Sequence, residues 1–476
     1  MNIDPISLSS FSVAGLLYVI LQLTVTMHIL LKKDDVKSSI GWIGLVWLAP
    51  LLGSIVYVLF GINRIRRKAL SLRNKGPDLL TMTGKTAEEI EKEIPPAFLQ
   101  LIRLGYKVHP QLFALGNNVQ PFLNGDSAYP EMCRLISSAK KEVLLQSYIF
   151  NNDSAGKLFL SAFKQAVQNG AKVKVLIDGV GLNYSKPTIA RELKKIKGVE
   201  FGIFLPSKKP ITLPFVNLRN HRKILIVDGE NAFFGGMNIA EGNLVNQNPK
   251  APIIDITFKV QGAVVDQMSR VFEEDWIFAK KKHFTPASFH HSSFQLGNLP
   301  ARIIPDGPDS DYGKIELLIL GALSCAQKTI QIVTPYFLPE NNILNALEVA
   351  AMRGVDVEII LPEKSNIFGM DRAMRANFRS LLAKGVKIYR TRPPFDHSKI
   401  MIVDKAWLLV GSANWDVRSF KLNFECCMEC IDVALARKIE KIIKQKKELA
   451  TRENIEKTPF FPLLLDKAFK LLTPYY

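Results

Sequence analysis

The chain has 476 residues, of which 47% are apolar and 22% are charged, a balance that excludes a disordered or low-complexity protein. Lysine and arginine outnumber aspartate and glutamate by 62 to 44, and the formal charge of +18 indicates a polyanionic partner, either nucleic acid or an anionic membrane surface. The five cysteines are an odd, uneven set that makes no disulfide framework and indicates a reducing compartment.

Two apolar segments open the chain. Residues 11–31 carry no formal charge over 21 residues, and residues 40–62 carry none over 23. Each is long enough for a bilayer-spanning helix, and Pro50 inside the second is tolerable where neighbouring helices satisfy the freed carbonyl. We therefore expect a transmembrane hairpin over residues 1–62; a pair of buried core helices is the less favoured alternative.

The cations that flank these segments predict their orientation. The polar turn at 32–39 carries three, and the stretch after the second segment carries six: Arg64, Arg66, Arg67, Lys68, Arg73 and Lys75. Cytoplasmic flanks are enriched in such residues, so we expect the long C-terminal part on the cytoplasmic side.

The rest of the chain contains a duplicated α/β pattern. Residues 139–150 and 326–337 each read as a helix end, a strand and an aromatic loop, and each is followed by a helical stretch and a second strand, at 173–178 and 355–361. Such alternation predicts two domains with a largely parallel or mixed sheet. The expected organisation is a hairpin (1–62), a connector (63–110), a first domain (111–285), a second domain (286–436) and a basic amphipathic C-terminal segment (437–476).

Both domains carry the same spacing of polar residues. The two copies are His221, Lys223, Asp228 and Asn238 in the first half, and His397, Lys399, Asp404 and Asn414 in the second. Alternate residues of a strand share a face, so each His is expected to project beside its Lys. A surface strand would explain one His-x-Lys, but it does not explain two copies in register.

The chemistry of this set favours a phosphate site. A lysine competes with a metal beside a histidine, so no metal or other cofactor is expected, whereas Lys can bind a phosphate while His attacks it or donates a proton. The amides of Asn238 and Asn414 can donate to phosphoryl oxygens. Because one His must attack and another must protonate the leaving oxygen, we expect a pseudo-two-fold pairing of the halves.

These motifs resemble those of the phospholipase D superfamily, and in particular its bacterial cardiolipin synthases. The similarity covers nearly the whole chain and includes residues 178–181, 217–225, 307–311, 334–339 and 418–425, besides Gly41, Trp42, Pro50 and Tyr57 in the hairpin. It implies an α/β fold of two pseudo-symmetric phospholipase D-like mixed-sheet domains, preceded by the two-helix hairpin. It also places the chain in the bacterial inner membrane as a multi-pass protein.

The resemblance implies phosphatidyl transfer between two phosphatidylglycerol molecules, which gives cardiolipin and glycerol through a phosphatidyl-histidine. It assigns His221 as the nucleophile and His397 as general acid and then base, with Lys223, Lys399, Asn238 and Asn414 on the phosphate. Asp228 and Asp404 complete the two catalytic motifs, but strand alternation does not bring them to the site, and we expect a structural role.

Two other carboxylates are better placed to orient the histidines. The superfamily has a His-bonding carboxylate at the start of the strand after each Asn, which corresponds to Asp255 and Glu425 here. A surface carboxylate is the alternative at each position. Residues 253–257 depart from the Arg-Asp-Thr-His type of segment that many relatives have before this strand.

Several alternatives stay open. Another phosphatidyltransferase or a phospholipase D, such as a phosphatidylserine synthase, would use the same histidines; a membrane-anchored nuclease and an inactive scaffold are less well supported. The expected partners are phosphatidylglycerol and anionic membrane lipids, with no nucleic acid, and a homo-oligomer is left open. Cys426, Cys427 and Cys430 favour core packing over a zinc site. The apolar tail at 460–472 either lies in the membrane interface or packs on the protein.

Overall fold

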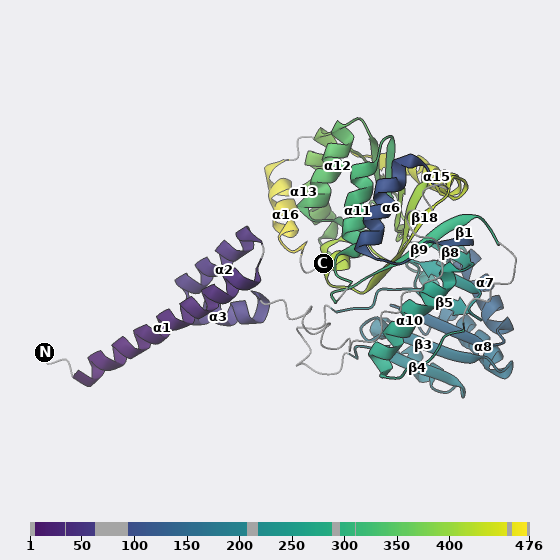
Figure 1. Cartoon of the computed structure of the whole chain (residues 1–476), viewed down its shortest axis with the longest axis horizontal. Helices are drawn as coiled ribbons and strands as arrows, with labels where there is room; N and C mark the ends of the chain where they lie inside the picture. Colours follow the sequence, from purple (N-terminus) through teal and green to yellow (C-terminus); the bar gives the residue numbers. More distant parts are fainter. Residues whose placement is uncertain are drawn as a thin grey trace. The chain divides into compact units, whose positions relative to one another are not determined.

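The computed structural model describes residues 5–33, 35–61, 94–206, 218–287, 296–309, 311–454 and 459–473. The chain divides into two compact units, Met1–Lys68 and Ala69–Tyr476 (Figure 1). Most of the expected connector, including the six cations at 64–75, lies outside the described residues, as does Asn217 of the first motif.

The N-terminal unit is helical. Its elements are α1 (Pro5–Lys32), α2 (Val36–Leu48), α3 (Pro50–Val56) and the π-helical turn η1 (Tyr57–Gly61). In α1 the segment Gly15–Lys32 is long and apolar enough to cross a membrane, and α2 is a shorter apolar helix. The expectation of one continuous second helix is wrong. Ala49 leaves the helical conformation before Pro50, whose ring cannot continue the hydrogen-bond ladder.

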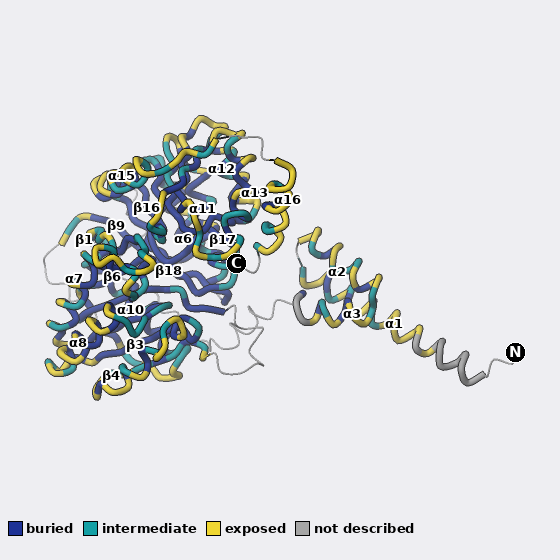
Figure 2. The backbone as a smooth tube through the Cα atoms, turned by 180° about the vertical axis from the view of Figure 1, so that it is seen from behind, coloured by how far each residue is buried: buried dark blue, intermediate teal, exposed yellow. Residues whose placement is uncertain are grey.

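The bend at Ala49 brings α3 back against α2. A Cβ on Gly53 would lie 2.4 Å from the carbonyl oxygen of Leu45, so only glycine allows this approach. Polar side chains of this unit bond inside it: Trp47 Nε1 donates to Thr26 Oγ1 at 3.1 Å, and Gln22 Nε2 donates to Trp47 O at 3.3 Å. Many leucines of this unit are exposed, and much of the backbone of α1, α2 and α3 is coloured as exposed in Figure 2, an arrangement that suits an apolar solvent.

The second unit is built on a 15-stranded mixed sheet among the described residues, in the order β19-β13-β12-β10-β15-β16-β18-β9-β1-β8-β6-β5-β2-β3-β4. The seven strands from β1 to β4 at one end repeat, in mirror order, as the seven from β9 to β13, and the two halves join through antiparallel β9 and β1. In each half three strands are parallel, which confirms the mixed sheet.

The strands of the first half are β1 (Ala114–Leu123), β2 (Glu142–Ser147), β3 (Lys172–Asp178), β4 (Val199–Phe204), β5 (Ile224–Val227), β6 (Asn231–Gly235), β7 (Ile253–Ile254) and β8 (Ile256–Gln261). Those of the second half are β9 (Leu299–Asp306), β10 (Thr329–Val333), β11 (Phe337–Leu338), β12 (Asp356–Pro362), β13 (Lys387–Thr391), β14 (Phe395–Asp396), β15 (Ile400–Val403), β16 (Trp407–Gly411), β17 (Trp415–Asp416), β18 (Glu425–Ile431) and β19 (Ala450–Arg452).

Helices cover both faces of this sheet because its central strands bury both sets of alternating side chains. In β2, Val143 and Leu145 enter the core that α7 and α8 share, and Leu144 is buried on the other face. The larger helices are α6 (Leu99–Val108), α7 (Asn124–Ser138), α8 (Ser154–Gln168), α10 (Val264–Lys280), α11 (Lys314–Cys325), α12 (Asn341–Met352), α13 (Met370–Ala383), α15 (Val433–Glu448) and α16 (Phe460–Lys470). Shorter turns are η2 (Pro96–Phe98), η3 (Gly181–Tyr184), α9 (Ile189–Leu193), η5 (Glu241–Asn243), η6 (Val245–Gln247) and α14 (Val417–Lys421).

Candidate active site

The two histidine motifs lie on extended segments that lead into β5 and β15. His221 and Lys223 precede β5, and His397 and Lys399 precede β15, so the expectation that they stand within strands is wrong by a few residues. Alternate side chains share a face in extended backbone as they do in a strand, so each lysine still lies beside the histidine of its motif. Lys223 Nζ donates to the carbonyl oxygen of His221 at 2.5 Å, and Lys399 Nζ donates to that of His397 at 2.6 Å.

Each histidine segment is bound by backbone to the other half of the unit. His221 N donates to Phe424 O at 2.8 Å, and Phe424 N returns a bond to Arg219 O. His397 N donates to Ile254 O at 2.7 Å beside the parallel pairing of β14 with β7. The strand edges of the two halves therefore bring both motifs to one place.

The orienting carboxylates cross between the halves. Nδ1 of His397, from the second half, lies 2.8 Å from Oδ2 of Asp255, which belongs to the first. Nδ1 of His221, from the first half, lies 3.1 Å from Oε1 of Glu425, which belongs to the second, in a less well aligned contact. Both carboxylates are fully buried, which excludes the alternative of surface residues.

The two carboxylates have different neighbours. Glu425 also accepts from Ser412 Oγ at 2.5 Å and from Asn423 Nδ2 at 3.1 Å. Asp255 accepts, apart from its histidine, from the backbone N–H of Ile256. Burial raises the pKa of Asp255 to about 7. Burial also acts to raise the pKa of Glu425, but His221, Lys223 and Ser412 together hold it below the ordinary value.

Burial and the neighbouring lysines also lower the pKa values of the histidines and lysines of the site. The pKa of His221 falls to about 4 because the ring is buried beside Lys223, and the pKa of His397 falls well below its ordinary value for the same reasons. Burial lowers the pKa of Lys223 to about 7 and that of Lys399 to about 8, against the pull of nearby carboxylates. The site thus holds two buried lysines beside two imidazoles whose neutral forms are favoured, and a bound anion would favour the charged forms of all four side chains.

The aspartates of the two motifs are structural in this fold. Asp228 accepts hydrogen bonds from the backbone N–H groups of Lys140, Lys141 and Glu142, at 2.7–3.2 Å. In the second half, Asp404 accepts from the backbone N–H groups of Gln327, Lys328 and Thr329, which lead into β10. Neither carboxylate has a hydrogen bond or ion pair to a histidine among the described residues, an arrangement that supports the expected structural role.

The two asparagines follow the strands that flank the motifs. Asn238 Oδ1 accepts from Ile149 N at 3.1 Å, which leaves its Nδ2 as the donor for a ligand. Asn414 is buried, and its Oδ1 has no hydrogen-bond partner in the described structure. Gly236 lies between the halves, where a Cβ would come within 3.0 Å of Lys399 Cδ.

Sequence reasoning missed the charged pairs behind each motif. Arg222 is fully buried and binds Asp275 of α10 at 2.9 Å, and its Nε donates to the carbonyl oxygen of Glu425. In the second half Lys446 of α15 binds Asp396 at 2.5 Å. The sequence shows charged residues next to each histidine, and Asp275 is one of four carboxylates in α10, so only the fold identifies the partners.

Two aromatic rings also line the site, and the spacing of the histidine motifs did not predict them. The Tyr148 ring lies 4.7 Å from the His221 ring, centroid to centroid, and the Tyr336 ring lies 6.5 Å from that of His397. Tyr336 OH donates to Asn366 Oδ1 at 2.6 Å, which fixes the ring beside the histidine.

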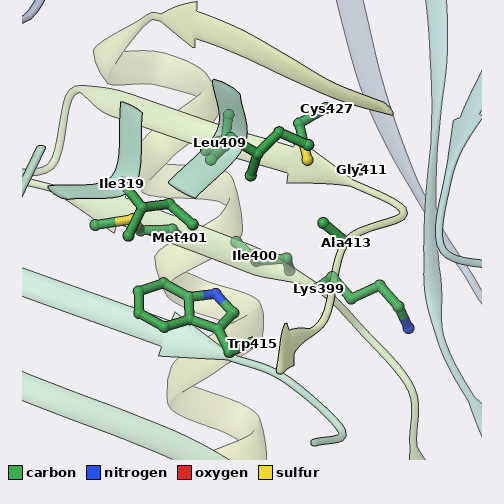
Figure 3. Close-up of a pocket in the computed structure, with 10 residues that line it drawn as sticks. Ile319, Lys399, Ile400, Met401, Leu409, Gly411, Ala413, Trp415 and Cys427 are labelled. Atoms are coloured by element: carbon green, nitrogen blue, oxygen red, sulfur yellow. The ribbon is translucent and has the colours of Figure 1, made fainter. Parts of the chain in front are cut away.

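A small apolar pocket lies behind Lys399, whose amine points away from it (Figure 3). Its lining includes Ile319, Met401, Leu409 and Trp415, so it belongs to the core and offers nothing to a phosphate. Cys427 also lines it, while Cys426 and Cys430 are buried toward the other face of β18. The described residues contain no cluster of three or more His, Cys, Asp or Glu side chains that could hold a metal.

Comparison with known proteins identifies the family. The model of the PLD-like domain of cardiolipin synthase matches residues 132–276 and 319–447, and the phospholipase D-nuclease N-terminal model matches residues 20–61. The major cardiolipin synthase of Bacillus subtilis is 31% identical over the whole of both chains. A cardiolipin synthase of Clostridium perfringens is 30% identical over 93% of this chain and 95% of its own.

Among solved structures, a phosphatidylserine synthase of Haemophilus influenzae superimposes with a TM-score of 0.61 at 16% identity, over 79% of this chain and 97% of its own. At that identity the likeness concerns the fold alone. The residues that the family model matches include both histidine motifs and most strands of the sheet, but not β1 and β9, through which the halves join. The chain belongs to the cardiolipin synthase family of phospholipase D-like enzymes.

Proposed function

We propose that the chain is a membrane-anchored cardiolipin synthase, which transfers a phosphatidyl group from one phosphatidylglycerol to another. The observation that carries this proposal is the pair of histidines with crossed carboxylates, beside two lysines, in a family of cardiolipin synthases. Such a site has two groups for two proton-coupled displacements at one phosphorus, and four nitrogen donors for its oxygens.

In the first displacement, Nε2 of His221 attacks the phosphorus and the bond to the glycerol oxygen breaks. His397 gives its proton to that oxygen, so glycerol leaves neutral and the phosphatidyl group stays on His221. The different surroundings of the carboxylates support this order. Glu425, held ionised by its hydrogen bonds, makes His221 a stronger nucleophile and stabilises the imidazolium that forms.

His397 must be protonated before it can act as an acid, yet the pKa of its ring is low while the site is empty of anions. A bound phosphodiester adds a negative charge beside the ring and raises that pKa. We therefore expect substrate binding to take up a proton.

In the second displacement, the hydroxyl of another phosphatidylglycerol attacks the phosphorus while neutral His397 accepts its proton. The P–N bond breaks, His221 is released and cardiolipin forms. One phosphodiester is exchanged for another, so the reactants and products of the overall reaction are close in free energy. A covalent intermediate suits such an exchange. Lys223, Lys399, Asn238 and Asn414 hold the phosphate oxygens through both steps.

The test is the purified chain with phosphatidylglycerol and a chelator, with lipid products resolved by mass. The proposal expects cardiolipin and glycerol in equal amounts, and none from the His221→Ala or His397→Ala proteins. Phosphatidic acid alone would identify a phospholipase D, and phosphatidylserine formed only when serine is added would identify a phosphatidylserine synthase. Either result would contradict the proposal.

We infer that the catalytic unit faces the cytoplasm and that the N-terminal helices span the bacterial inner membrane more than once. The excess of cations after the second apolar segment supports this orientation. A reporter active only in the cytoplasm, fused after Tyr476, should be active. Activity of a periplasmic reporter at the same position would overturn the orientation.

A further inference from the structure

Helix α16 presents its apolar side outward. Phe460 and Phe461 are 70% and 75% exposed, and Leu464, Leu465, Leu471 and Leu472 are also exposed, whereas the one carboxylate of the helix, Asp466, is buried (Figure 2). A helix that is packed on a soluble domain normally turns its apolar stripe inward. The exposed set of α16, with Phe368, is called the outer patch below.

The inverted helix is held in place by its polar side. Asp466 pairs with Arg372 and Arg375 of α13, at 3.3 and 3.5 Å, and Lys467 Nζ donates to Ala376 O. Phe469 adds an apolar contact to the core of the second half. The orientation of α16 is therefore fixed by the fold, and the outer patch does not arise from a detached tail.

A series of contacts and short chain segments connects Phe368 of the outer patch with the active site. Phe368 is 88% exposed, and its ring lies 5.7 Å from the ring of Phe469. Two residues earlier, Asn366 holds Tyr336 OH, and the Tyr336 ring packs on His397. A lipid that leaves a bilayer beside Phe368 would thus have its headgroup directed toward the catalytic histidine.

The charges around the outer patch are mainly positive. Together α13 and α16 carry five cations and two carboxylates, namely Arg372, Arg375, Arg379, Lys467 and Lys470 against Asp371 and Asp466. An apolar stripe with basic neighbours is typical of helices that lie in the interface of an anionic membrane. A dimer interface would expose the same apolar residues but would not require the cations.

We propose that the outer patch docks the catalytic unit on an anionic bilayer, with α16 lying in the plane of the interface. The occupant is lipid because an apolar N-terminal helix holds the same chain at a membrane, where bilayer surface is always within reach. Docking delivers phosphatidylglycerol to the site from its own leaflet. Docking of the catalytic unit on the bilayer can be measured whichever lipid product the enzyme forms.

The test places an environment-sensitive fluorophore on the full chain in vesicles of phosphatidylglycerol and phosphatidylcholine. Leu464→Cys carries the label in a protein with Cys133→Ser and Cys325→Ser, since the other three cysteines are buried. Leu158→Cys on α8 is the matched control, an exposed leucine on a helix of the first half. We expect a blue shift at 464 and loss of emission with nitroxide-bearing lipids, and neither change at 158.

Two outcomes would overturn the proposal. If the label at 464 reports an aqueous environment both in the mixed vesicles and in vesicles of phosphatidylcholine alone, α16 does not dock on the bilayer. A label that is shielded but is not quenched by nitroxide lipids, and whose shielding grows with protein density, would identify a second copy of the chain as the occupant. Weaker quenching in vesicles of phosphatidylcholine alone is expected from the basic neighbours.

A second variant tests the consequence for turnover. Phe461→Glu with Leu465→Glu changes only exposed side chains and leaves the contacts of Asp466 intact. We expect turnover of bilayer phosphatidylglycerol to fall about tenfold or more, since two large apolar side chains no longer enter the membrane. Turnover of a short-chain phosphatidylglycerol in micelles should be unchanged. Equal losses on both substrates would contradict docking.

Discussion

The two halves of the catalytic unit repeat the same strand order but support their histidines differently. His221 faces a glutamate that has two further side-chain donors, and His397 faces an aspartate whose pKa is raised to about 7. The first arrangement favours a negative charge beside the ring, whereas burial disfavours the charged form of Asp255 in the second. This difference supports the proposal that His221 acts as the nucleophile and His397 as the proton carrier.

Removal of either histidine should have the largest effect. We expect His221→Ala and His397→Ala each to lower kcat for cardiolipin formation by about 10⁴-fold or more, because neither half can perform the other's step. Rates of cardiolipin formation from phosphatidylglycerol measure this. If either variant kept near-native turnover, the paired-histidine account would be wrong.

Replacement of the two orienting carboxylates by amides should lower kcat to different extents in the two halves. Glu425→Gln should lower kcat by about 10³-fold, because a nucleophile loses the charge that stabilises its imidazolium, and Asp255→Asn by about 10²-fold. Both amides keep the size of the side chain, so thermal unfolding serves as the control for structure. A larger loss in Asp255→Asn would reverse the comparison.

The buried charged pairs behind the motifs should differ in the same way. Arg222→Met leaves Asp275 buried without its cation and should lower the free energy of unfolding by about 3–5 kcal/mol. Lys446→Met should cost less, because the Lys446 side chain is partly exposed whereas that of Arg222 is fully buried. Denaturant unfolding of the detergent-solubilised proteins measures both. Equal costs would mean that the two pairs support the fold alike.

The pH profile of kcat/KM should show the smallest difference between the halves. A lysine with a lowered pKa is cationic below that pKa and neutral above it, so phosphate binding weakens as pH rises through about 7 for Lys223 and then about 8 for Lys399. Lys223→Arg keeps its charge and should move the alkaline limb to higher pH. A kcat/KM that stays level to pH 9 in the unaltered protein would contradict this.

Much of the site could be predicted because its residues recur at one spacing. The repeat alone paired the histidines and lysines, and the family pattern pointed to Asp255 and Glu425. The crossing of these carboxylates could not be predicted from spacing, since it depends on the pairing of β7 with β14 and of Asn220 with Phe424 across the halves.

Other features depend on three-dimensional packing and leave weak traces in sequence. The second apolar segment reads as one helix because hydropathy does not register that Gly53 lets the chain bend back at Ala49. Arg222 and Asp275 are 53 residues apart and pair only when α10 covers the sheet. The tail at 460–472 could be read either way, and the burial of Asp466 resolves which side of α16 faces the protein.

The division of labour between the two histidines is tested most directly with a phosphatidyl ester of p-nitrophenol, whose leaving group needs no general acid. The account predicts that His397→Ala releases one burst of nitrophenol per site and holds a phosphatidyl adduct on His221, and that His221→Ala releases none. A burst from His221→Ala with the adduct on His397, or no burst from either protein, would contradict it.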